Sequence, residues 1–423
     1  MSASYLEQYD AASDADKPYL ARRWMDTEPL PFFKELRQKR PILVTPKFTL
    51  ITRFDDCREV LNMPKVFTVE PYVPKMGDYL MMHDDDALHT REKSLMQCML
   101  NRNDLPAVRE MVGKVSKEIL DEANGNIEIV NSYCRMVPAT LVREYFGLTG
   151  AKRKDLIEWS YWNQYDTFHN QPFDLLPPEK SQFIIDRHNE TSKELGAFIV
   201  ELIARRTLQV KAEEITLSTI VRLDDDIVTR MLRTDYPKQL EFDIKRLGIN
   251  AGGLLIGAVE TTSQAVAQVI QYLIQRPEWL TKAEAAATKE PLTEFDGIVW
   301  EALRFVPITP YLFRTTASDY TVAKGTEHET VLRKGSHVLP VTLSAMFDDR
   351  AFESPDEFIP GRNWYNYCHF GFGSHECLGR YVAGVMIPEM VRQVLMRQNV
   401  TAKASIDYKS GPFPEQYHLA WSA

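Results

Sequence analysis

The sequence predicts a mainly α-helical fold with minor β structure, organised as one large domain. Three observations lead to this class. Apolar residues recur at helical spacing over most of residues 88–305, short strand-like runs flank that region, and no linker-like segment divides the 423 residues. We therefore expect residues 1–423 to form a helical lobe (about 88–305 and 378–398) packed on a small β-rich lobe (about 30–70 and 306–345).

The predicted elements near the N-terminus are short. Residues 42–45 and 49–53 have the composition of two strands, and a helix capped by Asp55 or Asp56 follows through Leu61. Residues 64–86 contain three prolines and a glycine, which predict a long irregular stretch. Loops of this length in compact proteins are often functional.

The middle of the chain predicts a series of helices. Pro138 should kink or shorten the third of them, because proline removes a helical hydrogen bond. The seventh is unusually long, since about 36 residues rising 1.5 Å each would span ~54 Å. Short strands and coil over 309–340, a Pro/Gly-rich meander over 347–374 and a last helix from about Leu378 complete the chain. The predicted helices cover residues 88–100, 105–123, 131–147, 153–167, 179–206, 224–234, 239–275, 279–289 and 294–305.

Composition and charge exclude several classes of protein. Acidic residues outnumber basic ones, 59 to 50, whereas nucleic-acid-binding domains usually carry a basic excess. Five scattered cysteines do not form a disulfide framework and indicate a reducing compartment. No segment approaches the ~20 apolar residues that span a bilayer, and the N-terminus lacks signal-peptide features. We expect a cytoplasmic monomer with no membrane or nucleic-acid partner.

The strongest local signal is the glycine-rich loop Phe-Gly-Phe-Gly-Ser-His-Glu-Cys-Leu-Gly over residues 370–379. Its glycines allow positive φ and let a flat ligand approach the backbone closely. Cys377 precedes a predicted helix, whose free N–H groups stabilise a thiolate, so this residue is a candidate nucleophile or metal ligand. Two alternatives are a structural cysteine in a glycine-rich turn and a zinc site formed with His369 and His375. The zinc alternative lacks a second ligand pair at zinc-finger spacing.

This loop resembles the heme-binding loop of cytochromes P-450, in the pattern Phe-x-x-Gly-x-His-x-Cys-x-Gly. The resemblance implies that Cys377 is the axial ligand of a heme b iron. It places Phe370, Gly371, His375 and Gly379 around the same cofactor. In this family the thiolate ligand favours cleavage of the O–O bond.

The long predicted helix contains a second motif. Glycines weaken a helix interior by roughly 1 kcal/mol each, so Gly252, Gly253 and Gly257 indicate the close approach of a cofactor. A hydrogen bond from Thr261 to the carbonyl of Gly257 would loosen the turn and open a groove for O2 and water. Glu260 and Thr261 resemble the family's acid–alcohol pair, in which the alcohol holds the iron-bound oxygen and the acid supplies protons. The alternative is a Glu-Thr pair on the surface of an amphipathic helix.

Two charged groups complete the resemblance. Glu301 and Arg304 lie three residues apart on a predicted helix, and Arg362 follows in the meander; the family's buried, structural charge trio stands at these positions.

Three cationic residues correspond to the family's contacts with the heme propionates. These are His89, Arg314 and Lys93, where Lys93 replaces an arginine of the family pattern and pairs less directionally. Exposed cations or an ordinary helix start are the alternative interpretation.

The resemblance implies a heme-thiolate monooxygenase that inserts one atom of O2 into a hydrophobic small molecule, as enzymes of secondary metabolism do. Electrons would come from a separate ferredoxin or flavodoxin with its reductase, docked near Arg91, Arg102 and Arg380. A peroxide-driven peroxygenase, a heme-dependent isomerase or dehydratase, and a non-catalytic heme sensor remain alternatives. The expected substrate pocket draws on Met81, Met82, Leu254, Ala258, Thr309, Tyr311 and Phe413.

Overall fold

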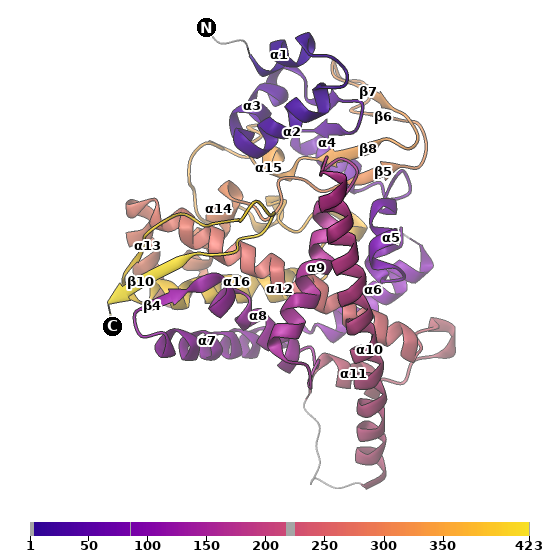
Figure 1. The fold of residues 1–423 in the computed structure, drawn as a ribbon, viewed down its shortest axis with the longest axis vertical. Helices are drawn as coiled ribbons and strands as arrows, with labels where there is room; N and C mark the ends of the chain where they lie inside the picture. Colours follow the sequence, from indigo (N-terminus) through magenta and orange to yellow (C-terminus); the bar gives the residue numbers. More distant parts are fainter. Residues whose placement is uncertain (1–3, 85, 217–224, 423) are drawn as a thin grey trace.

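The protein is mainly helical with a small amount of sheet, which confirms the expected fold class. The structure is a computed structural model that describes residues 4–84, 86–216 and 225–422. Helices hold 59% of its residues and strands 9%. Figure 1 shows the N-terminal helices and the largest sheet at the top, above a larger helical body.

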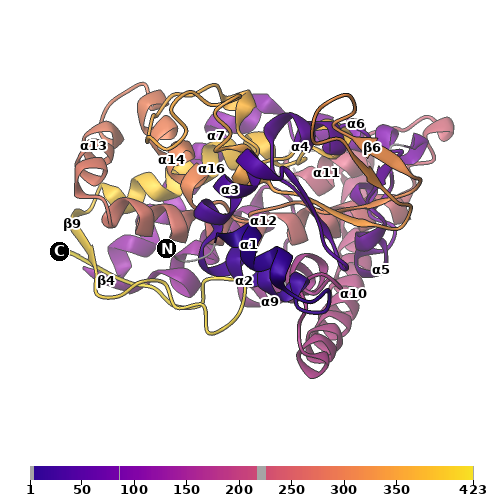
Figure 2. The same ribbon diagram turned by 90° about the horizontal axis from the view of Figure 1, so that it is seen from above.

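The helical body is built around one long helix, which lies near its middle in Figures 1 and 2. This central helix, α12, is buried on most sides because α8, α9, α10, α14 and α16 all pack against it. The helices of the body are α6 (Ala87–Met99), α7 (Leu105–Glu122), α8 (Met136–Glu144), α9 (Arg153–His169), α10 (Pro178–Thr216), α11 (Ile227–Arg233), α12 (Ile244–Ile274), α13 (Pro277–Ala287), α14 (Thr293–Phe305) and α16 (Arg380–Leu395).

The β-rich lobe contains a five-stranded sheet whose strands come from both ends of the chain. Its order is β1-β2-β8-β5-β3. Strands β2 and β8 pair in parallel, with Leu50 opposite Leu339, and this pairing joins the two expected β-rich segments. A separate hairpin pairs β6 (Tyr320–Val322) with β7 (Thr330–Leu332). The strands of the sheet are β1 (Ile42–Val44), β2 (Thr49–Ile51), β3 (Phe67–Thr68), β5 (Arg314–Thr316) and β8 (His337–Pro340).

The N-terminal part contains more helix than the sequence predicts. The segment expected to be β-rich from about residue 30 begins inside a helix, and the stretch expected to be irregular over 64–86 contains β3, one short helix and two 3-10 turns. Leucines and phenylalanines at helical spacing form a compact core here. The short helices are α1 (Tyr5–Ala11), α2 (Lys17–Thr27), α3 (Pro29–Lys39), α4 (Phe54–Leu61), α5 (Val73–Met76) and α15 (Thr342–Ala345).

A three-stranded sheet was missed entirely by the sequence analysis. Strands β4 (Asn126–Glu128), β9 (Gln398–Ala402) and β10 (His418–Ser422) pair in the order β4-β10-β9. Each is short, and β4 lies between two helices, so local periodicity gave no signal. The last helix accordingly ends at Leu395, before the expected residue 398.

Several helix boundaries differ from those predicted. Helix α12 has 31 residues and begins at Ile244, because Asp243 caps it and Glu241 has a left-handed φ of 49°. The helix expected over 131–147 starts as a π-helical turn and becomes α8 at Met136, which puts Pro138 in its first turn.

A buried ion cluster fastens the meander to α14. Glu301 and Arg304 are both fully buried, with Arg304 Nη2 donating to Glu301 Oε1 at 2.7 Å. Arg362 Nε donates to the same oxygen at 3.2 Å, and the Tyr367 hydroxyl donates to Glu301 Oε2 at 2.7 Å. Arg304 and Arg362 also bind backbone carbonyls of the meander, so every charge of the cluster is paired.

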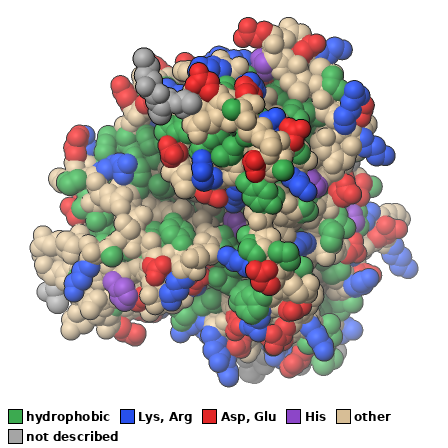
Figure 3. Space-filling view, turned by 45° about the horizontal axis from the view of Figure 1, so that its top comes forward, with side chains coloured by type: hydrophobic (Ala, Val, Ile, Leu, Met, Phe, Trp, Pro, Cys, Tyr) green, Lys and Arg blue, Asp and Glu red, His purple; other side chains and the backbone are tan. Residues whose placement is uncertain are grey.

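Acidic and basic side chains are interspersed over the face shown in Figure 3. That pattern differs from the basic stripe of a nucleic-acid-binding surface. Among the helices that the structure describes, none is both long and apolar enough to cross a membrane.

Candidate active site

The cysteine loop has the backbone shape that its glycines suggest. Gly371 and Gly373 have φ values of 68° and 74°, and a Cβ at Gly373 would lie 2.8 Å from the carbonyl oxygen of Leu61. The Cys377 N–H donates to the carbonyl of Phe370 at 2.9 Å, which closes the turn. The expectation of a positive φ at the loop glycines is wrong for Gly379, whose φ is −83°.

Cys377 lies just before α16, where backbone donors favour its thiolate. Burial leaves the pKa of the Cys377 thiol raised overall, and the N–H groups of Gly379 and Arg380 and the Lys93 ammonium act in the opposite direction. The side chain is accessible to small molecules although protein surrounds it closely, so it lines an internal space. A thiolate in this position can act as a metal ligand.

Helix α12 faces open space where the sequence predicts a cofactor. A Cβ at Gly257 would meet nothing within 4 Å, and Thr261, one turn later, is partly exposed although it lies in the middle of a buried helix. Tyr79 links the two walls of this space. Its ring would lie 2.2 Å from a Cβ at Gly253, and the nearby Cys377 thiolate adds to the effect of burial in raising its pKa.

Four cationic or imidazole side chains gather on one side of the Cys377 loop. The rings of His89 and His375 stack at 4.4 Å, and burial, together with Arg314, His89 and Lys93, lowers the pKa of His375 to about 2. The buried His375 Nε2 has no hydrogen-bond partner in the part of the chain that the structure describes. A dianionic cofactor such as heme supplies the carboxylates that such a cluster lacks, so these residues fit it.

Lys93 makes contacts that the sequence did not predict. Its ammonium donates to the carbonyl of Glu376 at 2.7 Å and to that of Ser374, both in the cysteine loop. Burial lowers the Lys93 pKa to about 8. Arg314 is also buried and donates to the carbonyl of Phe313 at 2.7 Å.

The acid and the alcohol of α12 point in different directions. Consecutive helical residues leave the axis about 100° apart. The Thr261 hydroxyl donates to the carbonyl of Gly257 at 2.7 Å, as expected. The Glu260 carboxylate instead turns into the protein, where it is 1% exposed and receives Arg135 Nε at 2.9 Å. Burial raises the Glu260 pKa to about 7, against the lowering effect of Arg135.

The expected substrate-pocket residues divide into two groups. Leu254 and Ala258 lie on α12 and are buried and partly buried, whereas Met82 is buried and Met81 partly buried in the 3-10 turn that follows Tyr79. Thr309 is partly buried as well, and its hydroxyl donates to the carbonyl of Tyr311.

Two expected pocket residues are committed to other contacts. The Tyr311 hydroxyl donates to Asp174 at 3.0 Å and receives Arg22 at 2.6 Å, so it is not a free polar group for a substrate. Phe413 packs in a separate aromatic cluster with Tyr165.

A family model described as cytochrome P450 matches residues 15–407. The chain belongs to the cytochrome P-450 family. It is accordingly a heme b-binding oxidoreductase that works as a monooxygenase, with a requirement for O2 and for redox partners.

Relatives and solved structures of other P-450 proteins are similar over most of their length. The monooxygenase PikC of Streptomyces venezuelae is 25% identical over 88% of this chain and 84% of its own. The mycinamicin IV hydroxylase/epoxidase of Micromonospora griseorubida is 24% identical over 86% and 87%. The structure of CYP109Q5 from Chondromyces apiculatus has a TM-score of 0.76 at 19% identity, covering 94% of this chain and 96% of that one.

The sequence also predicts Tyr79 as a polar group of the substrate pocket, and in the structure its ring packs against Gly253 of α12. Two other residues of this P-450 site were missed. Arg135 pairs with Glu260, and Glu415 pairs with Arg135. All three residues are far apart in the chain, so no local sequence pattern could predict these contacts. The zinc alternative is not supported, since no metal-binding group of three His, Cys, Asp or Glu exists among the described residues.

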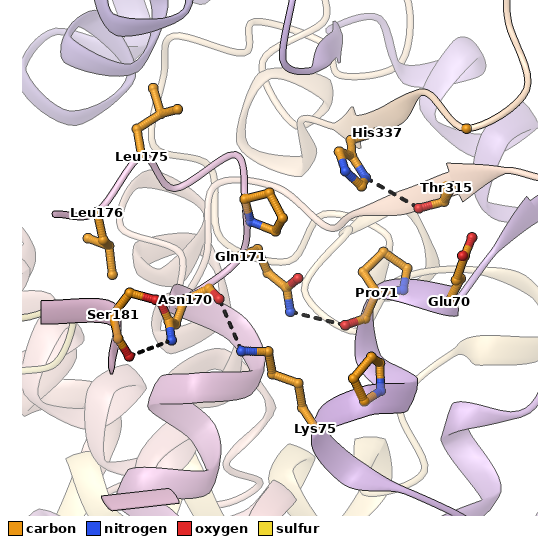
Figure 4. A pocket seen from close by; sticks show the side chains of 13 residues that line it. Glu70, Pro71, Lys75, Asn170, Gln171, Leu175, Leu176, Ser181, Thr315 and His337 are labelled. Atoms are coloured by element: carbon orange, nitrogen blue, oxygen red, sulfur yellow. Dashed lines mark hydrogen bonds between the residues drawn. The ribbon is translucent and has the colours of Figure 1, made fainter. Parts of the chain in front are cut away.

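A cleft of about 550 Å³ opens beside the β-rich lobe, and we call it the proline-rich cleft. Figure 4 shows its lining, in which Lys75 of α5 donates to the carbonyl of Asn170 at the end of α9 at 3.1 Å. Lys75 also pairs with Asp166 at 2.6 Å, and Gln171 donates to the carbonyl of Pro71 at 3.2 Å. These bonds connect the segment over 70–76 to the connection between α9 and α10.

Proposed function

We propose that Cys377 ligates the heme iron and that His89, Arg314 and His375 hold the propionates, with Lys93 bracing the cysteine loop. The observation that carries this proposal is an accessible cysteine whose sulfur interacts with the N–H groups of Gly379 and Arg380 and with the Lys93 ammonium, beside a cluster of cationic and imidazole side chains. Phe370, Gly371 and Gly379 would shape the loop that carries the thiolate, and Gly257 would leave room for the cofactor beside α12.

Bound heme supplies the activation of O2, so that one oxygen atom enters a C–H bond or a π system and the other leaves as water. The chain's own contribution is positional. Thr261 holds a hydroxyl in the open groove, fixed by its bond to the Gly257 carbonyl. Glu260 stores a proton near neutral pH, because burial raises its pKa to about 7.

A hydrophobic or weakly polar small molecule is the proposed substrate. The residues expected to line the groove are apolar, with Leu254 and Ala258 on α12 and Met81 and Met82 in the turn after Tyr79. The proline-rich cleft is the proposed route to the groove, because the segment that lines it through Pro71 and Lys75 leads along the chain to Tyr79, which packs against Gly253 of α12. The hydroxylase and epoxidase names of the relatives fit oxidation in secondary metabolism.

A ferredoxin or flavodoxin is the proposed electron donor, docking beside the cysteine loop. Arg102 is exposed there and stacks over Tyr381 at 3.8 Å, which makes it the best candidate contact. Arg380 is buried and paired with Glu376, and Arg91 pairs with Glu241 at 3.5 Å. Both arginines are therefore less available than Arg102 for contact with an electron donor. We also propose that the protein is a monomer and that it lies in the cytoplasm; the five free cysteines support the second proposal, because thiols stay unpaired in a reducing compartment.

Replacing Thr261 by alanine should divert electrons from product to hydrogen peroxide, because the groove loses the hydroxyl that holds O2 and relays protons. Positioned proton donors contribute about 100-fold or more, so product per electron should fall at least tenfold. The measurement is the ratio of product to peroxide with a substrate selected by its spin-state shift. Thr261→Ser keeps the hydroxyl and should retain most coupling; equal uncoupling in both variants would contradict the role.

Arg102→Glu should slow the first electron transfer about tenfold at low salt, because it reverses a charge on the proposed docking face. Stopped-flow reduction by a surrogate ferredoxin measures this rate. Arg333→Glu is the matched control, since that side chain is 76% exposed on the β6–β7 hairpin. Identical rates in both variants would place the docking face elsewhere.

A further inference from the structure

A second cleft lies between α9 and the segment over residues 408–415. Its volume is about 510 Å³, and we call it the tyrosine-rich cleft. Its lining includes Tyr161 and Tyr408, together with Arg135, which pairs with Glu260, and Glu415, which pairs with Arg135.

An unbroken chain of polar contacts runs from this cleft to Glu260. The Tyr161 hydroxyl donates to Glu415 Oε1 at 2.7 Å, and Arg135 Nη1 donates to Glu415 Oε2 at 3.3 Å. Arg135 Nε then donates to both carboxylate oxygens of Glu260, at 2.9 and 3.1 Å. The exposed fractions of the side chains fall in the same order, from 20% for Glu415 to 4% for Arg135 and 1% for Glu260.

Arg135 is held firmly in this position. Its Nη1 also donates to Asn131 at 2.6 Å, and its Nη2 donates to the carbonyl of Pro414 at 3.1 Å. One guanidinium therefore divides its charge between two carboxylates. Arg135 pairs with both Glu260 and Glu415, so the cation that stabilises the buried Glu260 carboxylate is shared with a second anion.

We propose that Glu415 and Arg135 are positioning residues that connect Glu260 to the solvent of the tyrosine-rich cleft and determine when it holds a proton. This inference rests on the proposed role of Glu260 as the acid of the α12 pair.

The transfer involves one proton and no electrons. A hydronium ion in the cleft gives its proton to the Glu260 carboxylate and remains as water. Glu260 then releases that proton toward the groove beside Thr261 and becomes a carboxylate again. Arg135 stays protonated throughout, because the two carboxylates outweigh its burial and raise its pKa.

The groups around Glu260 determine whether a substitution raises or lowers its pKa. Burial raises its pKa most, Arg135 lowers it, and Glu415 raises it further. Cys134 of the π-helical turn and Tyr161 of α9 also lie near enough to interact with its charge. Removing the charge of Glu415 should therefore lower the pKa of Glu260 and leave it ionised at neutral pH.

The test is an infrared pH titration of the heme-loaded enzyme, without turnover. The carboxylic-acid band that Glu260→Gln removes should have a midpoint near pH 7, as the Glu260 pKa of about 7 requires. In Glu415→Gln the midpoint should fall by about one unit or more, since a like charge sharing one arginine is lost. Glu158→Gln is the matched control, because Glu158 lines the same cleft but pairs with Arg187.

Oxygen reduction with a surrogate ferredoxin provides the second readout. The pH at which peroxide release increases should shift in Glu415→Gln in the same direction as the infrared midpoint, and stay fixed in Glu158→Gln. A titration of Glu415→Gln that matches wild type overturns this inference. If peroxide release changes in Glu260→Gln but not in Glu415→Gln, the proposed role of Glu260 stands and the link through Glu415 fails. If Glu260→Gln itself changes nothing, both fail.

Discussion

Replacement of Glu301 by alanine is expected to prevent the accumulation of folded, heme-loaded protein. Removing one member of a buried ion cluster costs about 3–5 kcal/mol, because the remaining charges stay buried without a partner. Here two arginines and the Tyr367 hydroxyl would lose their acceptor at once. Total stabilities of proteins are about 5–15 kcal/mol, so the loss is a large share.

Denaturant unfolding and heme content per protein measure this effect. Glu278→Ala is the control, since Glu278 forms an exposed pair with Lys282 and should change stability by less than about 0.5 kcal/mol. Similar midpoints for the two variants would mean that the cluster does not hold the meander.

Acid should weaken the same cluster. Burial by itself raises the Glu301 pKa. The hydrogen bond and charge of Arg304, together with the donors of Ile359 and Tyr367, outweigh burial, so the Glu301 pKa is lowered overall. A lowered folded pKa gives stability that is present above the ordinary glutamate pKa of about 4.3 and is lost as pH falls through the folded value.

The second large effect is expected at the proposed ligand itself. Cys377→Ser should lose monooxygenase turnover by about 1000-fold or more, because a serine hydroxyl does not supply the thiolate that the chemistry needs. Cys98→Ser is the control, since Cys98 is exposed and should leave both heme content and turnover unchanged. Comparable turnover in the two variants would rule out Cys377 as the axial ligand.

The sequence predicted those parts of the site whose residues lie in local patterns. The cysteine loop and the glycines of α12 are each defined by neighbours within a few residues, whereas the pair Glu301–Arg304 was assigned by its place in the chain ahead of Cys377. Thr261 reaches the Gly257 carbonyl for the same reason, because residues four apart face each other in a helix.

The missed features depend on contacts between distant segments. The direction of Glu260 follows from Arg135, which lies on a π-helical turn that no periodicity predicts. The hydroxyl of Tyr311 is bound by Arg22 and Asp174, two residues far away in the chain. The sheet of β4, β9 and β10 likewise joins short strands whose pairing is not local.

The most direct test is the absorption spectrum of the purified protein, reduced with dithionite and exposed to carbon monoxide. A Soret band shifted far to the red, and absent from Cys377→His, would show heme ligated by the Cys377 thiolate. A protein that contains no heme, or a carbon monoxide spectrum of the ordinary imidazole type, would contradict the heme-thiolate site on which the proposed function rests.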